Sequence, residues 1–236
     1  MTTTSPPVPA RSVRSVNPLV GVAARPGPEQ EYHDAAFHRL VEATDPQSWS
    51  IFGEVPSPVG SIDILAIQGR DEWRALATSI SCLDRSKVDG LSRLQRGRKY
   101  RKSTILRLAD LDEDSFGKLR QLHAFIAHGG LWSRSDLPSD HVRRLVAYEV
   151  KAAEFPRGVV QAGRRRAVAT ETWLVVPSEA TAGGLSPRTW DLVQRCGIGM
   201  RSADLKIFHP AVRGRRPTAI VINRMLRTVA QMAGES

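Results

Sequence analysis

The sequence has few cysteines and no long apolar run. Only two of its 236 residues are cysteine, Cys82 and Cys196, and they form no CxxC pair. Two cysteines at this spacing exclude a disulfide framework and a cysteine-rich zinc site, and they favour a reducing compartment. No stretch reaches the roughly 18 consecutive apolar residues that a membrane span needs. We therefore expect a soluble, cytoplasmic protein with no membrane partner.

Several sequence motifs of common enzyme classes are also missing. The six histidines form no HExxH motif, and His123 and His128 are five residues apart, which does not place them on one helix face. No Walker A loop is present, and no GxGxxG motif follows a strand. These absences exclude zinc-protease and nucleotide-driven chemistry of the usual kinds.

Positive charge is abundant. The chain has 34 Lys and Arg against 24 Asp and Glu, a formal net charge of +10. Such an excess points to a polyanionic partner such as nucleic acid, although a basic composition also fits a merely soluble protein. The length allows one core with an insertion, and this is the organisation that we expect.

The first part of the chain divides at a change in composition. Residues 1–30 are rich in Pro, Ser and Arg and predict a disordered tail. Helical periodicity then predicts a helix from Tyr32 to Ala43. The segments WSIFGEV and SIDILAI predict two strands, separated by a turn at PSPVG.

Residues 71–142 have a different amino-acid composition, which is rich in Arg, Leu, Ser, Lys and Asp. Their periodicity predicts a basic helical insertion without a convincing strand. One predicted helix covers DEDSFGKLRQLHAFIAHGG and ends at Gly129 and Gly130. Residues 103–131 could form a helix-turn-helix or winged unit that faces DNA, but paired helices are also common as plain scaffolding.

The remaining elements alternate between strands and helices. Leu145 to Ala152 predicts a buried strand, RGVVQAGRRRAVAT a helix and ETWLVVP a further strand. Ser186 and Pro187 have the residue types of an N-cap and a first helical position. IGMRSADLKIFHPA predicts a strand or a hairpin, and residues 212–236 a C-terminal helix.

Charged residues in two of the apolar strands indicate a site. Side chains alternate along a strand, so Glu149 and Lys151 lie on one face. If this strand is the neighbour of SIDILAI, Asp63 lies close to Glu149. Two adjacent carboxylates repel unless a cation bridges them, and oxygen ligands of this kind suit Mg²⁺. We therefore expect a metal at this position.

The order helix, strand, strand with Asp, strand with Glu-x-Lys, helix, strand resembles the core of the PD-(D/E)XK nuclease superfamily, which has a restriction-endonuclease-like fold. The residues that carry the resemblance are Asp63 in SIDILAI, Glu149 and Lys151 in YEVKA, and Gln161 in VVQAGRRRA. It covers about residues 31–70 and 143–211, and Ile62 stands where the family commonly has Pro. The implied fold is an α/β mixed central sheet flanked by helices, with an inserted helical subdomain.

The resemblance implies metal-dependent hydrolysis of phosphodiester bonds in DNA. Asp63, Glu149 and the backbone carbonyl of Val150 would hold Mg²⁺, for which Mn²⁺ could substitute, and Lys151 would orient or deprotonate a water. Gln161 would contact the substrate or order the edge of the site. Glu54 is a candidate additional acid, and Glu42 is a weaker rival. Cleavage of both strands would usually require a homodimer.

Two basic clusters are candidates for nucleic-acid binding. One is the run Arg164, Arg165 and Arg166, which could equally be a solvated helix face. The other belongs to the insertion and contains Arg96, Arg98, Lys99, Arg101 and Lys102. A regulator or complex subunit that binds DNA without cleaving it is the competing hypothesis, and a basic structural protein is the third.

Overall fold

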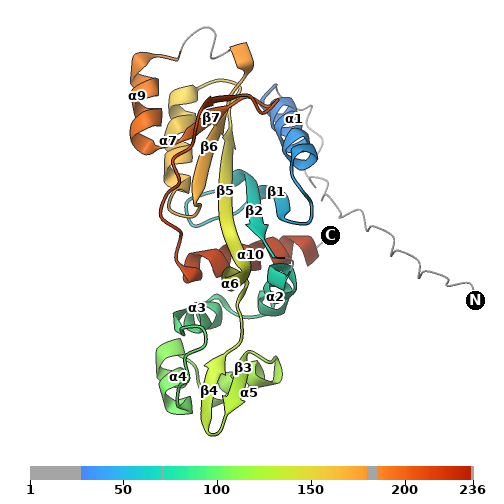
Figure 1. Cartoon of the computed structure of the whole chain (residues 1–236), viewed down its shortest axis with the longest axis vertical. Helices are drawn as coiled ribbons and strands as arrows, with labels where there is room; N and C mark the ends of the chain where they lie inside the picture. Colours follow the sequence, from blue (N-terminus) through green and yellow to red (C-terminus); the bar gives the residue numbers. More distant parts are fainter. Residues whose placement is uncertain (1–27, 71, 180–184, 235–236) are drawn as a thin grey trace, which may run out of the picture.

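Six strands form one mixed sheet in a computed structural model that describes residues 28–70, 72–179 and 185–234 (Figure 1). In spatial order the strands are β1 (Trp49–Val55), β2 (Ile62–Gly69), β5 (Val142–Val150), β6 (Glu171–Val175), β7 (Gly199–Arg201) and β8 (Ile207–His209). The pairs β1 with β2, β2 with β5, and β7 with β8 are antiparallel. The pairs β5 with β6 and β6 with β7 are parallel. The chain is thus an α/β protein with an open mixed sheet.

Helices cover both faces of this sheet. Helix α1 (Pro28–Ala43) packs through Ala36 and Leu40 on the face of β2 and β5 that contains Ile64 and Val146. The opposite face carries Leu65 and Leu145 and is covered by α10 (Ala219–Gly234). Helices α7 (Phe155–Arg165) and α9 (Pro187–Cys196) pack against β6 and β7. Alternate residues of β2 and β5 therefore pack into an apolar core on each face of the sheet.

Several local predictions are confirmed. The PSPVG segment connects β1 and β2, and Gly60 adopts a φ of 100°, which glycine tolerates without a steric cost. Ser186 caps α9 by accepting a hydrogen bond from the backbone N–H of Thr189, and Pro187 opens the helix. The segment after α9 forms the β7–β8 hairpin.

The insertion contains strands as well as helices, contrary to the prediction. Its elements are α2 (Glu72–Ser81), α3 (Arg85–Arg93), α4 (Lys102–Ala109), α5 (Glu113–Gln121), β3 (Phe125–His128), β4 (Leu131–Arg134) and α6 (Pro138–His141). Helix α5 ends at Gln121 because Phe125 turns into the insertion's own core, where its ring stacks 4.8 Å from that of Phe116. Gly129 and Gly130 both have positive φ and form a tight hairpin turn.

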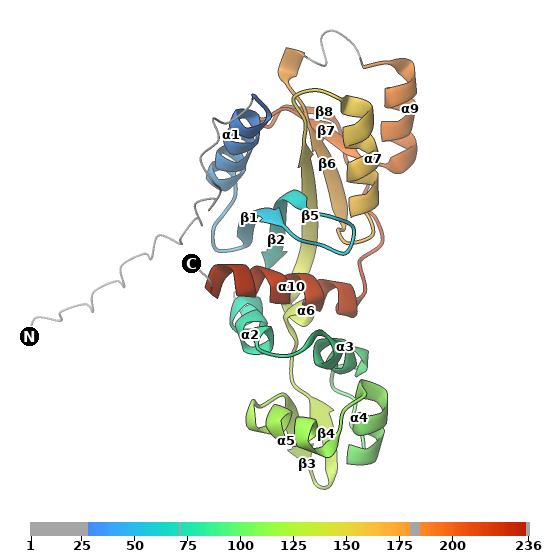
Figure 2. The ribbon, with the colours of Figure 1, turned by 180° about the vertical axis from the view of Figure 1, so that it is seen from behind.

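The insertion attaches to the core through α10, which lies between the sheet and α2, α3 and α6 (Figure 2). The side chain of Asn223 in α10 is fully buried there. Its Oδ1 accepts from the backbone N–H of Ser139 at 2.9 Å, and its Nδ2 donates to Ser92 Oγ at 2.9 Å. Arg224 forms an ion pair with Asp89 of α3. Polar contacts therefore hold the two parts together.

Three predicted boundaries change. Helix α1 begins at Pro28, inside the predicted tail, whereas residues 1–27 lie outside the described part of the chain. Helix α7 ends at Arg165, since Val168 and Ala169 pack into the core as the chain approaches β6. The C-terminal helix begins at Ala219, and residues 212–218 are extended. None of the helices in the described ranges is long and apolar enough to cross a bilayer.

Candidate catalytic site at the end of β5

Two carboxylates meet where β2 begins and β5 ends. Ile64 pairs with Tyr148 across these strands, and the next position toward the sheet end brings Asp63 opposite Glu149. The predicted adjacency of the two strands is therefore confirmed. Because opposed residues of an antiparallel pair point to the same face, both acids lie on the side of Leu65 and Ala147. The sheet register alone brings these two charges together.

Backbone hydrogen bonds hold Asp63 in place. Its Oδ2 accepts from the backbone N–H of Val150 at 2.8 Å. Its own backbone carbonyl lies 3.0 Å from Nε2 of His33, a buried residue of α1. Asp63 thus connects β2 with both β5 and the helix on the other face of the sheet.

Glu149 is almost completely buried, with 1% of its surface exposed. Its Oε1 lies 3.4 Å from Lys151 Nζ, and its Oε2 lies 3.7 Å from Arg165 Nη2 but has no hydrogen bond within the described structure. Burial, together with the neighbouring charge of Asp63, raises the Glu149 pKa from 4.5 to about 7, although Lys151 and Arg165 partly oppose this shift. Near neutral pH the carboxyl group is therefore poised between its two protonation states.

Lys151 lies between two glutamates. Besides Glu149, its Nζ donates to Oε1 of Glu29 in the first turn of α1, at 2.7 Å. Burial alone would lower the Lys151 pKa, but the hydrogen bond with Glu29 and the charges of Asp63 and Glu149 outweigh burial and raise it. The ammonium form is therefore the stable one.

Helix α7 packs directly over Lys151. A Cβ atom on Gly158 would lie 2.7 Å from Lys151 Cγ and 2.8 Å from Leu174 Cδ1, so only glycine allows this approach. Gln161 follows on the same helix, and its side-chain oxygen is buried without a hydrogen bond in the described part of the chain. The structure thus leaves the expected substrate contact of Gln161 untested.

The two further candidate acids have different positions. Glu54 has a φ of 50° and accepts from Ser61 Oγ at 3.1 Å, and its Oε1 is 3.8 Å from His33 Nε2. The carboxylate of Glu54 and the backbone carbonyl of Asp63 therefore both lie close to Nε2 of His33. Glu42 is exposed and paired with Arg39 near the C-terminal end of α1, about 20 Å along the helix from Glu29. Glu29, which lies inside the predicted tail, is the acid of α1 that reaches the site.

The donor set partly fits a magnesium ion. Asp63 supplies one carboxylate, and Glu149 has an unpartnered buried oxygen. Mg²⁺ is often held by one or two carboxylates while keeping several waters. In the described ranges, however, no three His, Cys, Asp or Glu side chains gather closely enough to hold a metal. Lys151 and Arg165 already supply positive charge beside the acids.

The predicted nucleic-acid contacts separate into buried and exposed residues. Arg165 is 5% exposed and donates inward to the carbonyls of Val59 and Ser61, so the expected phosphate contact is wrong for this residue. Arg166 donates to the carbonyls of Gly197, at 2.8 Å, and Val212, at 3.1 Å, whereas Arg164 is exposed. The run is therefore one exposed arginine followed by two structural ones.

The basic residues of the insertion lie on its surface. Arg96 pairs with Asp136 at 2.7 Å, Arg98 lies over the ring of Tyr100, and Lys102 pairs with Glu113. Lys99 and Arg101 are exposed, and neither side chain has a polar partner among the described residues.

Comparison with known proteins finds no match to a family model, to a curated protein or to a solved structure.

Proposed function

We propose that the protein is a metal-dependent endonuclease that hydrolyses phosphodiester bonds in DNA. One observation carries the proposal: Asp63, Glu149 and Lys151 meet at one end of the sheet, from two strands separated by the whole insertion. The element order also supports it. Helix α1, three antiparallel strands β1, β2 and β5, helix α7 and the parallel strand β6 occur in the order that the resemblance to the restriction-endonuclease-like fold implies.

Asp63 and Glu149 would hold Mg²⁺ or Mn²⁺ with the help of the Val150 carbonyl. The ion would polarise the phosphate and lower the pKa of a bound water. Since the Glu149 pKa is about 7, binding of the cation would displace a proton from this carboxyl group. Asp63 is held for this task by its hydrogen bond from Val150.

Lys151 would act through its charge. The contacts with Glu29 and Glu149 favour its ammonium form, which makes it a poor proton acceptor. A protonated Lys151 would instead orient the attacking water and stabilise the negative charge that develops on the phosphate. This role requires Glu29 to release the ammonium group when DNA binds.

Incubation of supercoiled plasmid with Mg²⁺ or Mn²⁺ tests the proposal. The wild-type chain should nick the plasmid, and chelation of the metal should stop it. Asp63→Asn and Lys151→Met should each reduce the rate by about 100-fold or more. Glu154→Gln is a matched control, because Glu154 is an exposed acid between Lys151 and α7 that pairs with Arg157. Equal nicking by the wild-type chain and Asp63→Asn would refute the proposal.

The second candidate function is DNA binding without cleavage. One observation favours it: Lys151 and Arg165 already place positive charge beside Glu149, which is part of the compensation that a metal would give. A metal-independent shift of DNA in gels, with no nicking by the wild-type chain, would support this function. Cleavage of both strands, by contrast, would require two copies of the chain on one duplex.

A further inference from the structure

The connection between β8 and α10 forms a basic ridge. Residues 210–218 contain three arginines, Arg213, Arg215 and Arg216, and no acid. The extended part, residues 210–218, runs along one edge of the molecule from the α7–α9 end of the sheet to α10 (Figure 1). A segment with charge of one sign on an outer edge attracts polyanions.

The backbone of this connection is firmly held. The N–H of Val212 donates to the carbonyl of Gly197 at 3.1 Å, and that of Gly214 donates to Thr170 at 2.8 Å. Arg216 then donates to the carbonyl of Val142 at 2.9 Å. The path of the connection is thus fixed along the starting ends of the parallel strands, from just before β7 to the first residue of β5.

Two arginines of the connection point away from these contacts. Arg213 and Arg215 are exposed, and neither side chain has a polar partner in the described part of the chain. Arg164 of α7 lies at the upper end of the same edge, where it lines a groove with Arg195 of α9 and Val212. Arg195 is paired with Asp191, whereas Arg164, Arg213 and Arg215 have no acid partner among the described residues and are therefore well suited to phosphate contacts.

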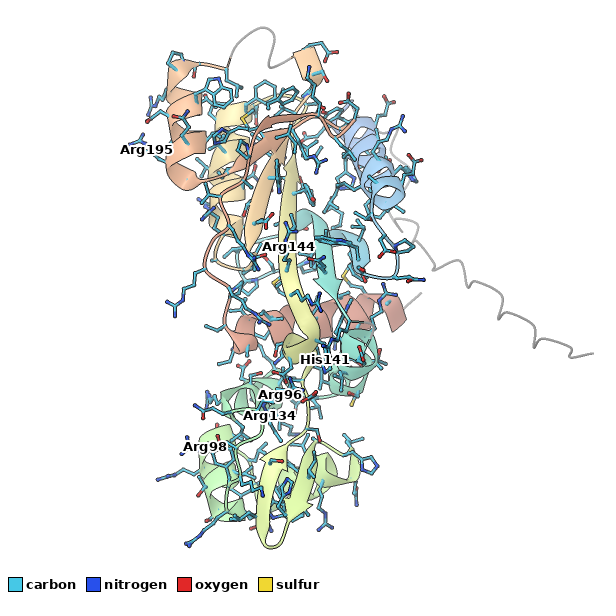
Figure 3. All side chains as sticks on the ribbon, viewed as in Figure 1. Arg96, Arg98, Arg134, His141, Arg144 and Arg195 are labelled. Carbon is cyan, nitrogen blue, oxygen red and sulfur yellow. The ribbon has the colours of Figure 1, made fainter. Side chains whose placement is uncertain are left out.

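The basic loop of the insertion continues this edge. Figure 3 shows Arg98 and Arg195 on the same side of the molecule. Between them, the start of α10 connects to α3 through Asn223 and the Arg224–Asp89 ion pair. The exposed Lys99 and Arg101 follow α3, so the basic positions extend from the core to the insertion.

In a helix-turn-helix the second helix usually contacts DNA, but here its position is less favourable than the loop before α4. Helices α4 and α5 are joined by a three-residue turn, and the β3–β4 hairpin follows them as a wing would. The first turn of α5, however, contains Glu113 and Asp114, and Asp112 caps it. Three acids at this end would repel the DNA backbone, so the loop before α4 is the favourable contact.

We propose that a single DNA duplex binds along this edge and contacts Lys99 and Arg101 at one end and Arg213, Arg215 and Arg164 toward the other. The substrate assignment rests on the proposed function, whereas the binding surface does not. Strand β5, of nine residues, separates the insertion from Glu149. It is about 26 Å long, or about eight base pairs of B-form DNA. A duplex that contacts Lys99 and Arg101 and also reaches Glu149 therefore needs to be longer than this.

Fluorescence anisotropy without metal tests the surface. The probes are labelled duplexes of about 8 and about 30 base pairs, each titrated at several salt concentrations. The variants are Lys99→Ala with Arg101→Ala, and Arg213→Ala with Arg215→Ala. Arg39→Glu is the matched control, because it removes the same two units of charge from the exposed face of α1, away from the connection.

Each paired variant should weaken binding of the long duplex by about tenfold and reduce the slope of log K against log salt by about 2, since two phosphate contacts are lost. The control should change neither quantity appreciably. The wild-type chain should bind the long duplex at least tenfold more tightly than the short one. Wild-type affinity and salt slope in Arg213→Ala with Arg215→Ala, or equal affinity for both duplexes, would overturn the proposal. Because no metal is present, a failure of cleavage leaves these outcomes unaffected.

Discussion

The carboxylate of Asp63 in β2 accepts a hydrogen bond of 2.8 Å from the backbone N–H of Val150 in β5. The same side chain therefore joins two strands and lies beside Glu149. A substitution at position 63 can disturb the sheet, the candidate site or both. Two different substitutions separate these effects.

Asp63→Asn keeps an oxygen that can accept from Val150, and Asp63→Ala does not. We expect Asp63→Ala to lower the free energy of unfolding by about 1 to 3 kcal/mol, because a backbone donor loses its partner. Asp63→Asn should lose less than half of that amount. Both should reduce cleavage by about 100-fold or more, since both remove the charge. Urea denaturation and plasmid nicking measure the two effects, and equal stability of the two variants would contradict the structural role.

Glu149 makes stability depend on pH in a defined direction. Its pKa rises from 4.5 to about 7 on folding. Between these values the folded chain holds a proton that the unfolded chain has released, so the free energy of unfolding falls as pH rises through this window. The full cost, about 3 kcal/mol, is present above pH 7.

Glu149→Gln stays neutral and should avoid this cost. We expect it to be more stable than the wild-type chain by about 1 to 3 kcal/mol near pH 8.5, with little advantage near pH 4.5. Urea titrations in the presence of a chelator would measure the difference at both pH values. An advantage that does not change with pH would show that burial of this charge is not its cause.

Arg164 and Arg165 should behave in opposite ways although they are neighbours. Arg165→Ala removes a buried guanidinium that contacts the Val59 and Ser61 carbonyls and Glu149, so we expect a loss of about 3 to 5 kcal/mol in stability. Arg164→Ala should be neutral in stability and should reduce the salt dependence of DNA binding by about one phosphate contact. Thermal unfolding and anisotropy together test this contrast, which the reverse pattern would refute.

Glu29 is one of three acids that favour the ammonium form of Lys151. Glu29→Gln removes an anion 2.7 Å from the ammonium group, so the Lys151 pKa should fall and the amine should become more reactive. Timed acetylation near pH 9, followed by peptide mass spectrometry, would measure the rate at Lys151. Lys99, exposed on the insertion, is the internal reference whose rate should not change. An unchanged rate at Lys151 would show that Glu29 does not protect it.

Periodicity and residue type were sufficient to predict most of the core. The pairing of the strands that carry Asp63 and Glu149 could be predicted from two apolar segments. In each segment the charged positions lie on one face. The cap at Ser186 follows from a local pattern of hydroxyl and proline. These features depend on interactions within a few residues or on strict alternation.

The errors concern residues whose surroundings come from distant parts of the chain. Arg165 is buried because the β1–β2 turn offers it two carbonyls more than 100 positions away, which an arginine run does not reveal. Glu29 reaches Lys151 only because α1 crosses the end of the sheet. The β3–β4 hairpin has a local signal, the Gly129–Gly130 pair, but a glycine pair is equally typical of the end of a helix.

The buried amide of Asn223 fixes the position of the insertion relative to the candidate site. It joins α10 to α3 of the insertion, at Ser92, and to the segment that leads from the insertion back to the core, at Ser139. A swinging motion of the insertion would leave these polar groups unsatisfied in an apolar surrounding, which is unfavourable. The interval between the loop at Lys99 and the acids Asp63 and Glu149 is therefore constant, so any cuts should fall at a set offset from the DNA that this loop contacts.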